Sequence, residues 1–374
     1  MFQAHLGHSK NSSGDAYKMK TYNTAIIGCG AIHTLHVQAI NSVQNARVYA
    51  VVDVDKDRAD QHAEKYGCKS FVDYKEMLAD ENIDCVHICT PHFLHVPMAI
   101  DCLKAGKHVL MEKPLAISTH QAQQLEKICK ISDSMLGICF QNRYNDASVK
   151  TKEIISQGFA GKVLGARAFV TWHRNASYYA SGQWRGKINT EGGGVLINQA
   201  IHTLDLVQWF TGKAVSVKGS VYTSLLEKYI EVEDTASASI IFDNGATAVF
   251  YATNCHVSDS PVLIEIECEN AVLRIENDLT IRLKNTARSS DDLINLFGSS
   301  SETCTENTVA ANNQIKHGEK ACWGTGHKRL ISDFYKKIST GEKFPVDFYE
   351  ALETVKITEG IYVSSKTGKF VELN

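Results

Sequence analysis

Short apolar runs alternate with amphipathic segments through the first part of the chain, and this pattern constrains the fold more than any other feature. The apolar runs resemble strands that are buried on both faces of a parallel sheet. The segments between them carry apolar residues at helical spacing. The predicted strands are Ala25–Ile27, Val48–Val52, Cys85–Cys89, His108–Met111 and Leu136–Phe140, and the predicted helices are Leu35–Val43, Arg58–Tyr66, Val96–Ala105 and Gln121–Ser132. This order predicts a doubly wound α/β sheet with right-handed crossovers.

A different pattern follows Asn145. A helical segment, Ala147–Gln157, precedes a series of apolar or alternating runs separated by turn signals, which predicts an antiparallel or mixed sheet in a second domain. The predicted strands are Val163–Trp172, Val215–Ser224, Ala236–Phe242, Ala246–Thr253, Val262–Cys268 and Ala271–Glu276. The polar stretch Ser289–Lys320 predicts a loop. Two helices, His327–Ile338 and Tyr349–Lys366, and a short strand complete the prediction.

Length and charge narrow the function. With 374 residues and 44% hydrophobic composition the chain can form two domains, expected at residues 19–143 and 144–374, after a disordered extension at residues 1–18. The formal net charge of -3, with acids and bases interspersed, argues against nucleic acid or a membrane surface as partners. No apolar run approaches the roughly 20 residues of a membrane span, so we expect a cytoplasmic protein.

The cysteines carry no metal-binding pattern. There are 11 of them, scattered along the chain, and the close pair Cys85 and Cys89 lies on one predicted strand. A zinc site needs paired ligands at short spacing, so we expect no metal and reduced thiols that pack as small apolar residues.

A glycine motif follows the first predicted strand and precedes the first helix. Gly28 would allow a tight turn and Gly30 would let phosphates approach, with the backbone N–H groups of Ala31 and Ile32 at the helix start. His33 stands where the usual third glycine would be. Asp53, after the second strand, is placed to bind the adenosine ribose hydroxyls and to repel a 2′-phosphate, and no arginine follows it directly. The motif therefore predicts NAD as cofactor in preference to NADP.

Two later strand ends should meet the same crevice, because ligands gather beyond the carboxyl ends of parallel strands. One is Thr90-Pro91 and the other is Glu112-Lys113-Pro114. The ammonium group of Lys113 could stabilise a developing alkoxide, although a surface lysine would give the same pattern.

The predicted helix Val195–Phe210 is apolar around most of its circumference but carries a polar stripe. Asn198, His202 and Asp205 recur at intervals of four and three residues, so they would lie on one side of the helix. Such groups must bond to one another or face a polar cavity, since an unpaired one costs about 1–3 kcal/mol. We therefore predict His202 as a general base. The alternative is a core histidine bonded to Asp205.

These motifs together resemble the glucose–fructose oxidoreductase/inositol dehydrogenase/rhizopine catabolism (Gfo/Idh/MocA) family. They are Gly28-x-Gly30 with His36, Thr90-Pro91 with His95, Ala105-Gly106-Lys107-His108-Val109 leading to Glu112-Lys113-Pro114, and Gly192-Gly193-Gly194 through His202 and Asp205. The resemblance runs from about Tyr22 to the C-terminus. It implies an N-terminal Rossmann domain and a C-terminal α/β domain with a large, mostly antiparallel open sheet, through which homodimers or homotetramers would form.

The resemblance also implies roles for single residues. Lys113 matches the active-site lysine and His202 the catalytic histidine, while Asn198 stands where the family often has aspartate, so it can bind a sugar hydroxyl but cannot take a proton. The remaining implied residues are His95 and Glu112 near the cofactor and Arg143, Tyr179, Trp184 and Arg185 near the substrate, where the last group could equally make interdomain contacts.

The function that the resemblance implies is NAD-dependent hydride transfer between nicotinamide and a carbinol or ketone carbon of a sugar, inositol, glycoside or nucleotide sugar. Two alternatives remain. One is a regulator on the same fold that senses NAD or a sugar, since fold alone does not fix function. The other is a reductase of another cyclic substrate, such as a bilin or a dihydrodiol. The presence of both Lys113 and His202 favours catalysis.

Overall fold

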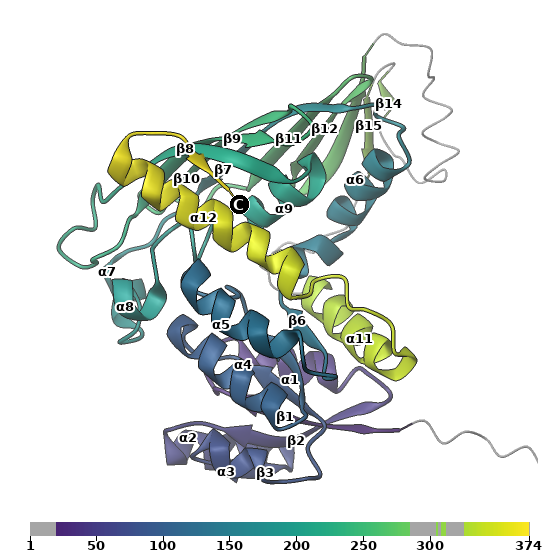
Figure 1. The fold of residues 1–374 in the computed structure, drawn as a ribbon, viewed down its shortest axis with the longest axis vertical. Coiled ribbons are helices and arrows are strands. Elements are labelled where there is room, and N and C mark those ends of the chain that lie inside the picture. The colour runs from purple at the N-terminus through teal and green to yellow at the C-terminus, as the bar shows by residue number, and fades with distance from the viewer. Residues whose placement is uncertain (1–19, 285–303, 306–307, 312–324, 374) are drawn as a thin grey trace, which may run out of the picture.

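The computed structural model describes residues 20–284, 304–305, 308–311 and 325–373, and the predicted extension at 1–18 lies outside them. Figure 1 shows an α/β unit in purple and blue beneath a unit dominated by one broad sheet, with the long helix α12 (Phe348–Thr367) running between them. Among these residues no helix has the length and apolar character needed to cross a membrane.

The lower unit is built on a parallel six-stranded sheet, which confirms the predicted doubly wound fold. Its strands are β1 (Tyr22–Ile27), β2 (Ala46–Val52), β3 (Lys69–Phe71), β4 (Cys85–Ile88), β5 (His108–Met111) and β6 (Leu136–Ile138), in the order β3-β2-β1-β4-β5-β6. The order reverses between β1 and β4. In such sheets the carboxyl ends of the two strands at the reversal open a crevice for ligands.

Local sequence accounts for the ends of the connecting helices. They are α1 (His33–Ile40), α2 (Lys56–Tyr66), α3 (Tyr74–Leu78), α4 (His95–Lys104) and α5 (Thr119–Cys129). Asp55 begins α2 by accepting the backbone N–H of Arg58, and Gly67 ends it in the left-handed conformation at φ 63°. Ser118 begins α5 in the same way. These are the residue types that satisfy unpaired backbone groups at helix ends.

The upper unit carries a ten-stranded sheet of the predicted, mostly antiparallel kind. Its order is β14-β15-β13-β12-β11-β7-β10-β9-β8-β16, and among these strands β7 and β10 are the parallel pair. The strands are β7 (Val163–Thr171), β8 (Ala214–Tyr222), β9 (Thr235–Phe242), β10 (Thr247–Thr253), β11 (Leu263–Cys268), β12 (Ala271–Glu276), β13 (Asp278–Leu283), β14 (Cys304–Thr305), β15 (Thr308–Ala311) and β16 (Val371–Glu372). Helices α6 (Asp146–Ser156), α9 (Ile201–Thr211) and α12 lie on one side of this sheet in Figure 1.

The C-terminal part of the chain returns to the first unit. Helix α11 (Thr325–Thr340) packs on α1, and its residues Leu330, Phe334 and Tyr335 belong to the core of the parallel sheet. Residues beyond 325 therefore contribute to both cores, and the division after residue 143 stays a prediction.

Two sequence predictions are wrong in detail. The helix predicted at Val195–Phe210 begins only at Ile201, because the backbone before it is hydrogen-bonded to Glu233. The N–H groups of Gly194 and Leu196 donate to the Glu233 carboxylate. The N–H group of Val195 donates to the main-chain carbonyl of Glu233. The loop predicted at Ser289–Lys320 contains the short strands β14 and β15, which extend the sheet beyond β13. The rest of that stretch lies outside the described residues.

Candidate active site

The glycine turn after β1 has the geometry of a phosphate-binding turn. Gly28 has φ 95°, and a Cβ there would lie 2.6 Å from the carbonyl oxygen of Cys89, so a larger residue does not fit. At Gly30 a Cβ would meet no atom within 4 Å, which leaves open space beside the backbone. Helix α1 starts without a side-chain cap at Ile32. The turn therefore fits a pyrophosphate, which would contact the exposed N–H groups of Ala31 and Ile32.

Asp53 is tied to this turn and to an arginine. Its carboxylate accepts the N–H of Cys29 at 2.9 Å and that of Asp55 at 3.0 Å, and Nη2 of Arg58 lies 2.7 Å away. Burial alone would raise the pKa of Asp53, but these hydrogen bonds outweigh it and hold the pKa below its usual value. Although no arginine directly follows Asp53 in the sequence, the fold brings Arg58 to it. The expected preference for NAD therefore depends on Arg58 as well as on the carboxylate of Asp53.

His95 joins the two strand-end loops that were expected to face the crevice. Its Nδ1 lies 2.8 Å from the carbonyl oxygen of Pro114, and its Nε2 lies 2.9 Å from that of Thr90. Its ring is thus used to hold Thr90-Pro91 against Lys113-Pro114. Glu112 is buried, and its carboxylate is hydrogen-bonded to Nε2 of His36 at 3.0 Å.

Lys113 lies against the segment that precedes α9. Its Nζ donates to the main-chain carbonyl of Asn198 at 3.1 Å and to Oδ1 of the same residue at 3.3 Å. Burial lowers the pKa of Lys113, and the negative charge of Glu112 opposes that shift. Lys113 is therefore in direct contact with Asn198, which lies 85 positions further along the chain.

Glu191, which the sequence analysis missed, completes this contact. Its Oε1 accepts a hydrogen bond of 2.5 Å from Nδ2 of Asn198, and burial raises its pKa. Asn198 thus lies between an ammonium group and a carboxyl group. The position of Glu191 directly before the glycine triplet was the one signal that could have pointed to it.

His202 lies in the first turn of α9, as a half-buried ring with little hydrogen bonding. Its Nε2 is 3.4 Å from the side-chain nitrogen of Gln141, and Nδ1 has no hydrogen-bond partner among the described residues. Burial, and then the charge of Lys113, hold its pKa well below the usual value, so the ring is neutral at neutral pH. A neutral imidazole beside a lysine can accept a proton from a substrate hydroxyl.

The alternative, a core histidine hydrogen-bonded to Asp205, does not match the structure. Asp205 instead receives two hydrogen bonds from Arg143, at 2.8 and 2.7 Å, and a third from Thr354. Arg143 is itself 4% exposed in its side chain and reaches Glu350 at 2.9 Å. Arg143 was expected to bind substrate, but its N–H groups donate to the carboxylates of Asp205 and Glu350. These ion pairs join the segment after β6 to α9 and α12.

Trp184 and Arg185, which were expected to bind substrate, lie near the loop that follows β4. The guanidinium group of Arg185 lies between two rings, 4.5 Å from the centroid of Tyr178 and 4.6 Å from that of Trp184. Trp184 in turn lies 4.8 Å from the ring of His92, which follows Pro91. Arg185 has no carboxylate within 4.0 Å among the described residues.

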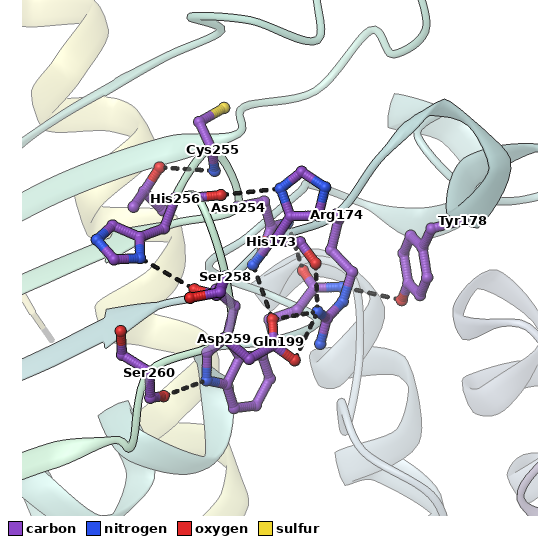
Figure 2. A network of polar contacts seen from close by, with 12 residues as sticks. His173, Arg174, Tyr178, Gln199, Asn254, Cys255, His256, Ser258, Asp259 and Ser260 are labelled. Carbon is purple, nitrogen blue, oxygen red and sulfur yellow. Dashed lines mark hydrogen bonds and ion pairs between the residues drawn. The ribbon is translucent and has the colours of Figure 1, made fainter.

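Tyr178, rather than the expected Tyr179, faces the site. The Tyr178 hydroxyl accepts from Gln199 at 2.9 Å and from Arg185 at 2.6 Å. Tyr179 is 5% exposed and its hydroxyl accepts from the buried Asn254. Figure 2 shows the network behind these contacts, in which Gln199 reaches Tyr178 and Arg174 reaches Asp259. Both tyrosines lie on the short helix α7 (Ala176–Ala180), where Tyr179 belongs to a small core and Tyr178 packs against that core with its hydroxyl turned to Gln199 and Arg185.

One group of potential metal ligands occurs within the described ranges. The ligand atoms of His36, Glu112 and His327 lie within 4.8 Å of one another, and all three residues are buried. Oε1 of Glu112 lies 3.0 Å from Nε2 of His36, which is a hydrogen-bond distance, and 3.4 Å from Nε2 of His327. The nine cysteines between Cys29 and Cys268 are free thiols.

Comparison with known proteins identifies both units. Residues 22–140 match the oxidoreductase family with an NAD-binding Rossmann fold, and residues 148–274 match the GFO/IDH/MocA C-terminal domain. The inositol 2-dehydrogenase of Rubrobacter xylanophilus is 31% identical over 189 residues, which are 50% of this chain and 51% of that protein. The myo-inositol 2-dehydrogenase of Thermotoga maritima is 29% identical over 230 residues, with 60% and 66% covered. The chain thus spans between half and two thirds of these relatives.

A solved structure matches over a longer range. The WlbA dehydrogenase from Bordetella pertussis, in complex with NADH and UDP-GlcNAcA, has a TM-score of 0.81 and 25% identity, and the match covers 95% of this chain and 99% of that one. It spans the parallel sheet and the ten-stranded sheet alike. The chain therefore belongs to the GFO/IDH/MocA family of oxidoreductases, with an NAD-binding Rossmann fold.

Proposed function

We propose that this protein is an NAD-dependent dehydrogenase that transfers a hydride between nicotinamide and a carbinol carbon of a sugar, inositol, glycoside or nucleotide sugar. The observation that carries the proposal is the contact of Lys113 with Asn198, beside a neutral His202, at the edge where the parallel sheet ends. That combination provides a cation and a proton acceptor next to the expected position of the dinucleotide.

In the oxidation direction His202 takes the hydroxyl proton of the substrate and the Lys113 ammonium stabilises the alkoxide that forms. Bound nicotinamide supplies the acceptor for the hydride. Asn198 holds Lys113 in place through its carbonyl oxygen. In the reduction direction the same two groups stabilise and protonate the oxygen of the ketone.

The substrate pocket is proposed to include Asn198, Trp184, Arg185 and Tyr178. An indole ring suits the apolar face of a sugar ring, and the guanidinium of Arg185, which has no carboxylate partner among the described residues, suits a carboxylate or phosphate on the substrate. Relatives act on different compounds: two are named for inositol, and another was solved with the acidic nucleotide sugar UDP-GlcNAcA. Arg185 favours the acidic class.

The cofactor is proposed to be NAD, because the carboxylate of Asp53 would repel a 2′-phosphate. The protein is further proposed to form a homodimer or homotetramer through the uncovered face of the ten-stranded sheet, and to work in the cytoplasm. Against the regulator alternative stands the pairing of Lys113 with His202, which sensing alone would not need. The second alternative, a reductase of another cyclic substrate, would use Lys113 and His202 on a less polar compound.

A nicotinamide absorbance assay tests the proposal. The purified protein is incubated with NAD⁺ or NADP⁺ and a panel of inositols, neutral sugars, uronic acids and nucleotide sugars with and without a carboxylate. Turnover with NAD⁺ on the acidic members is expected. Binding of NAD⁺ without turnover on any member would favour the regulator, and turnover on neutral inositols alone would remove Arg185 from substrate binding.

A further inference from the structure

His92 is a buried side chain that the proposed reaction leaves unused. It follows Thr90-Pro91 at the end of β4 and begins the short 3-10 turn His92–Leu94. Its Nδ1 lies 2.8 Å from the main-chain carbonyl oxygen of Glu191, and its ring centroid lies 4.8 Å from that of Trp184. Both contacts cross from the parallel-sheet unit to the segment before α9, so His92 lies where the two units meet.

Glu191 connects His92 to the proposed active site. The main-chain carbonyl of Glu191 holds the ring of His92, while its side chain accepts a hydrogen bond from Asn198. Asn198 in turn receives the hydrogen bonds of Lys113. Trp184, the proposed platform for a sugar ring, packs against His92 directly. His92 is therefore one residue away from the Lys113–Asn198 contact and beside the proposed substrate pocket.

The carbonyl oxygen of Glu191 fixes which ring nitrogen of His92 carries the proton. A carbonyl only accepts hydrogen bonds, so Nδ1 of His92 must be the N–H donor. Burial, and then the positive charge of Lys113, hold the pKa of His92 well below its usual value, so the ring is neutral at neutral pH. A neutral imidazole with its proton on Nδ1 carries a lone pair on Nε2. Nε2 of His92 can therefore accept a hydrogen bond and cannot donate one.

This acceptor has no partner in the part of the chain that the structure describes, and it is not sealed off. The neighbouring His95 uses both of its ring nitrogens, which bond to the carbonyls of Thr90 and Pro114. In contrast, His92 is bonded through Nδ1. The polar atoms that lie fully buried without a partner in the described ranges belong to other side chains, so Nε2 shares in the 4% of His92 that is exposed. Such an acceptor suits a donor that arrives with a ligand.

Trp184 indicates what that donor is. An indole ring offers an apolar face on which the C–H face of a sugar ring can lie. The hydroxyl groups project from the edge of such a sugar, toward the residues that surround the indole, of which His92 is one. A hydroxyl can donate to Nε2, whereas the carboxylate or phosphate proposed for Arg185 has no proton to give. The two neighbours of Trp184 therefore suit different groups of one substrate.

We infer that His92 is a specificity-determining residue of the proposed dehydrogenase: its Nε2 accepts a hydrogen bond from a hydroxyl group of a sugar or polyol that lies against Trp184. The inference rests on the proposed function and narrows its substrates to those with a free hydroxyl at this position. A buried acceptor left without a donor weakens binding, so the site rejects a deoxy analogue that lacks this hydroxyl.

Two variants separate the two nitrogens of His92. In His92→Asn the amide N–H group takes the place of Nδ1 and can still donate to Glu191, but nothing replaces Nε2. In His92→Gln the amide oxygen takes the place of Nε2 and can accept from the substrate, but the donor to Glu191 is lost. His120→Asn, on the exposed surface of α5, is the matched control.

The first test measures, by calorimetry on the NADH-bound full-length protein, the dissociation constants of D-glucuronate, UDP-glucuronate and myo-inositol. We expect His92→Asn to raise the dissociation constant of the compound that binds by about tenfold or more, and His92→Gln to raise it by a smaller factor. The affinity for NADH should stay the same in both variants. The reverse order, with His92→Gln the weaker binder, would show that His92 acts only through Glu191 and would overturn the inference.

The second test reads Nε2 directly, by NMR of the protein labelled with [¹⁵N]histidine, with the His92 signals assigned by their loss in His92→Asn. His92 is expected as the Nδ1–H tautomer. The Nε2 signal should move upfield when the same compounds are added to the NADH-bound protein, and not when NADH is added alone. The Nε2–H tautomer would contradict the inference. A shift with NADH alone would do so too, because the donor would then be the carboxamide of the nicotinamide.

The two tests also separate the inference from the proposed function. If a sugar or polyol binds and is turned over while neither the variants nor the Nε2 signal respond, the inference fails and the proposed function stands. If none of the compounds binds and the substrate panel gives no turnover, the proposed function fails and the inference fails with it.

Discussion

Arg58 lies 2.7 Å from the carboxylate of Asp53, so the acidic side chain at the end of β2 forms an ion pair. The same carboxylate holds the glycine turn through the N–H of Cys29. A free Asp53 would repel a 2′-phosphate, whereas a free Arg58 would attract one. The balance between these two side chains is what we expect to select the cofactor.

Replacement of Asp53 by serine tests this balance. Asp53→Ser should weaken NAD⁺ use and leave Arg58 free, so the ratio of kcat/KM for NADP⁺ to that for NAD⁺ should rise by about tenfold or more, a change of about 1.4 kcal/mol. Asp55→Ser is the control, because it removes a carboxylate two positions away that caps α2. An unchanged ratio in Asp53→Ser would mean that this carboxylate does not discriminate between the cofactors.

The ammonium group of Lys113 supplies the second prediction. Lys113→Met keeps the length of the side chain but removes the charge, and it should lower kcat by about 10²–10³-fold, as loss of one group that stabilises a developing oxyanion does elsewhere. The affinity for NAD⁺, measured by protein fluorescence, should change little. Lys75→Met, on the exposed surface of α3, serves as the control. Turnover that survives in Lys113→Met would remove this lysine from the mechanism.

Much of this architecture could be predicted because it depends on local patterns. Five of the six parallel strands, all but β3, are visible as short apolar runs with amphipathic segments between them, and the glycine turn can be located from Gly28 and Gly30 alone. The start of α9 could not be found this way. Residues 195–200 have helical spacing, but the backbone groups of Gly194 and Leu196 bond to Glu233, which lies far along the chain.

Other features that sequence reasoning missed depend on such distant contacts. Lys113 and His202 could be proposed from strand-end position and polar spacing. In contrast, the bond between Thr24 and Tyr335 joins residues 311 positions apart, and nothing local to either predicts it. Arg143 shows the converse, since its motif suggested a substrate contact and its partners Asp205 and Glu350 are set by the packing of helices.

Buried histidines lead to a prediction about acid stability. Burial lowers the folded-state pKa of His36, His87, His92, His95 and His202 below the value of about 6.5 in the unfolded chain. The unfolded state therefore binds more protons as the pH falls below about 6.5, and stability is lost in that range. Each unit of depression corresponds to about 1.4 kcal/mol. Glu191, Asp205 and Glu233, whose pKa values burial raises, act in the opposite direction but are fewer than these histidines.

Urea unfolding at pH 8, 7, 6 and 5 measures this effect. The free energy of unfolding should fall between pH 6.5 and 5, and it should fall less steeply in His202→Gln, because glutamine takes up no proton. A free energy that stays level or rises over this interval would show that the buried carboxyl groups outweigh the histidines.

The uncovered face of the ten-stranded sheet gives a prediction about assembly. Val249 on β10 is 55% exposed, and the neighbouring rings of Phe169 and Tyr251 lie 6.4 Å apart. A surface of this kind is typical of subunit interfaces. Val249→Lys should shift the mass measured by light scattering toward the monomer, whereas Val257→Lys, in a loop and 92% exposed, should not. Equal masses for the two variants would place any interface elsewhere.

The contact between Asn198 and Glu191 makes the most specific prediction about the site. An aspartate at this position would place a second carboxylate there, whereas Asn198 donates to Glu191 at 2.5 Å. Asn198→Asp would set two carboxyl groups against each other, and both cannot ionise at that distance. We expect kcat at pH 7 to fall by about tenfold, since Lys113 would face a pair that shares a proton.

The exchange of the two groups should reverse this loss. In Asn198→Asp with Glu191→Gln a carboxylate and an amide again face each other with their roles exchanged, so kcat should recover toward that of the original protein. The single variant Glu191→Gln completes the cycle, which should give a coupling free energy of about 1–3 kcal/mol between the positions. Additive effects would mean that Asn198 and Glu191 act on Lys113 independently, and the contact would then have no part in setting the state of the lysine.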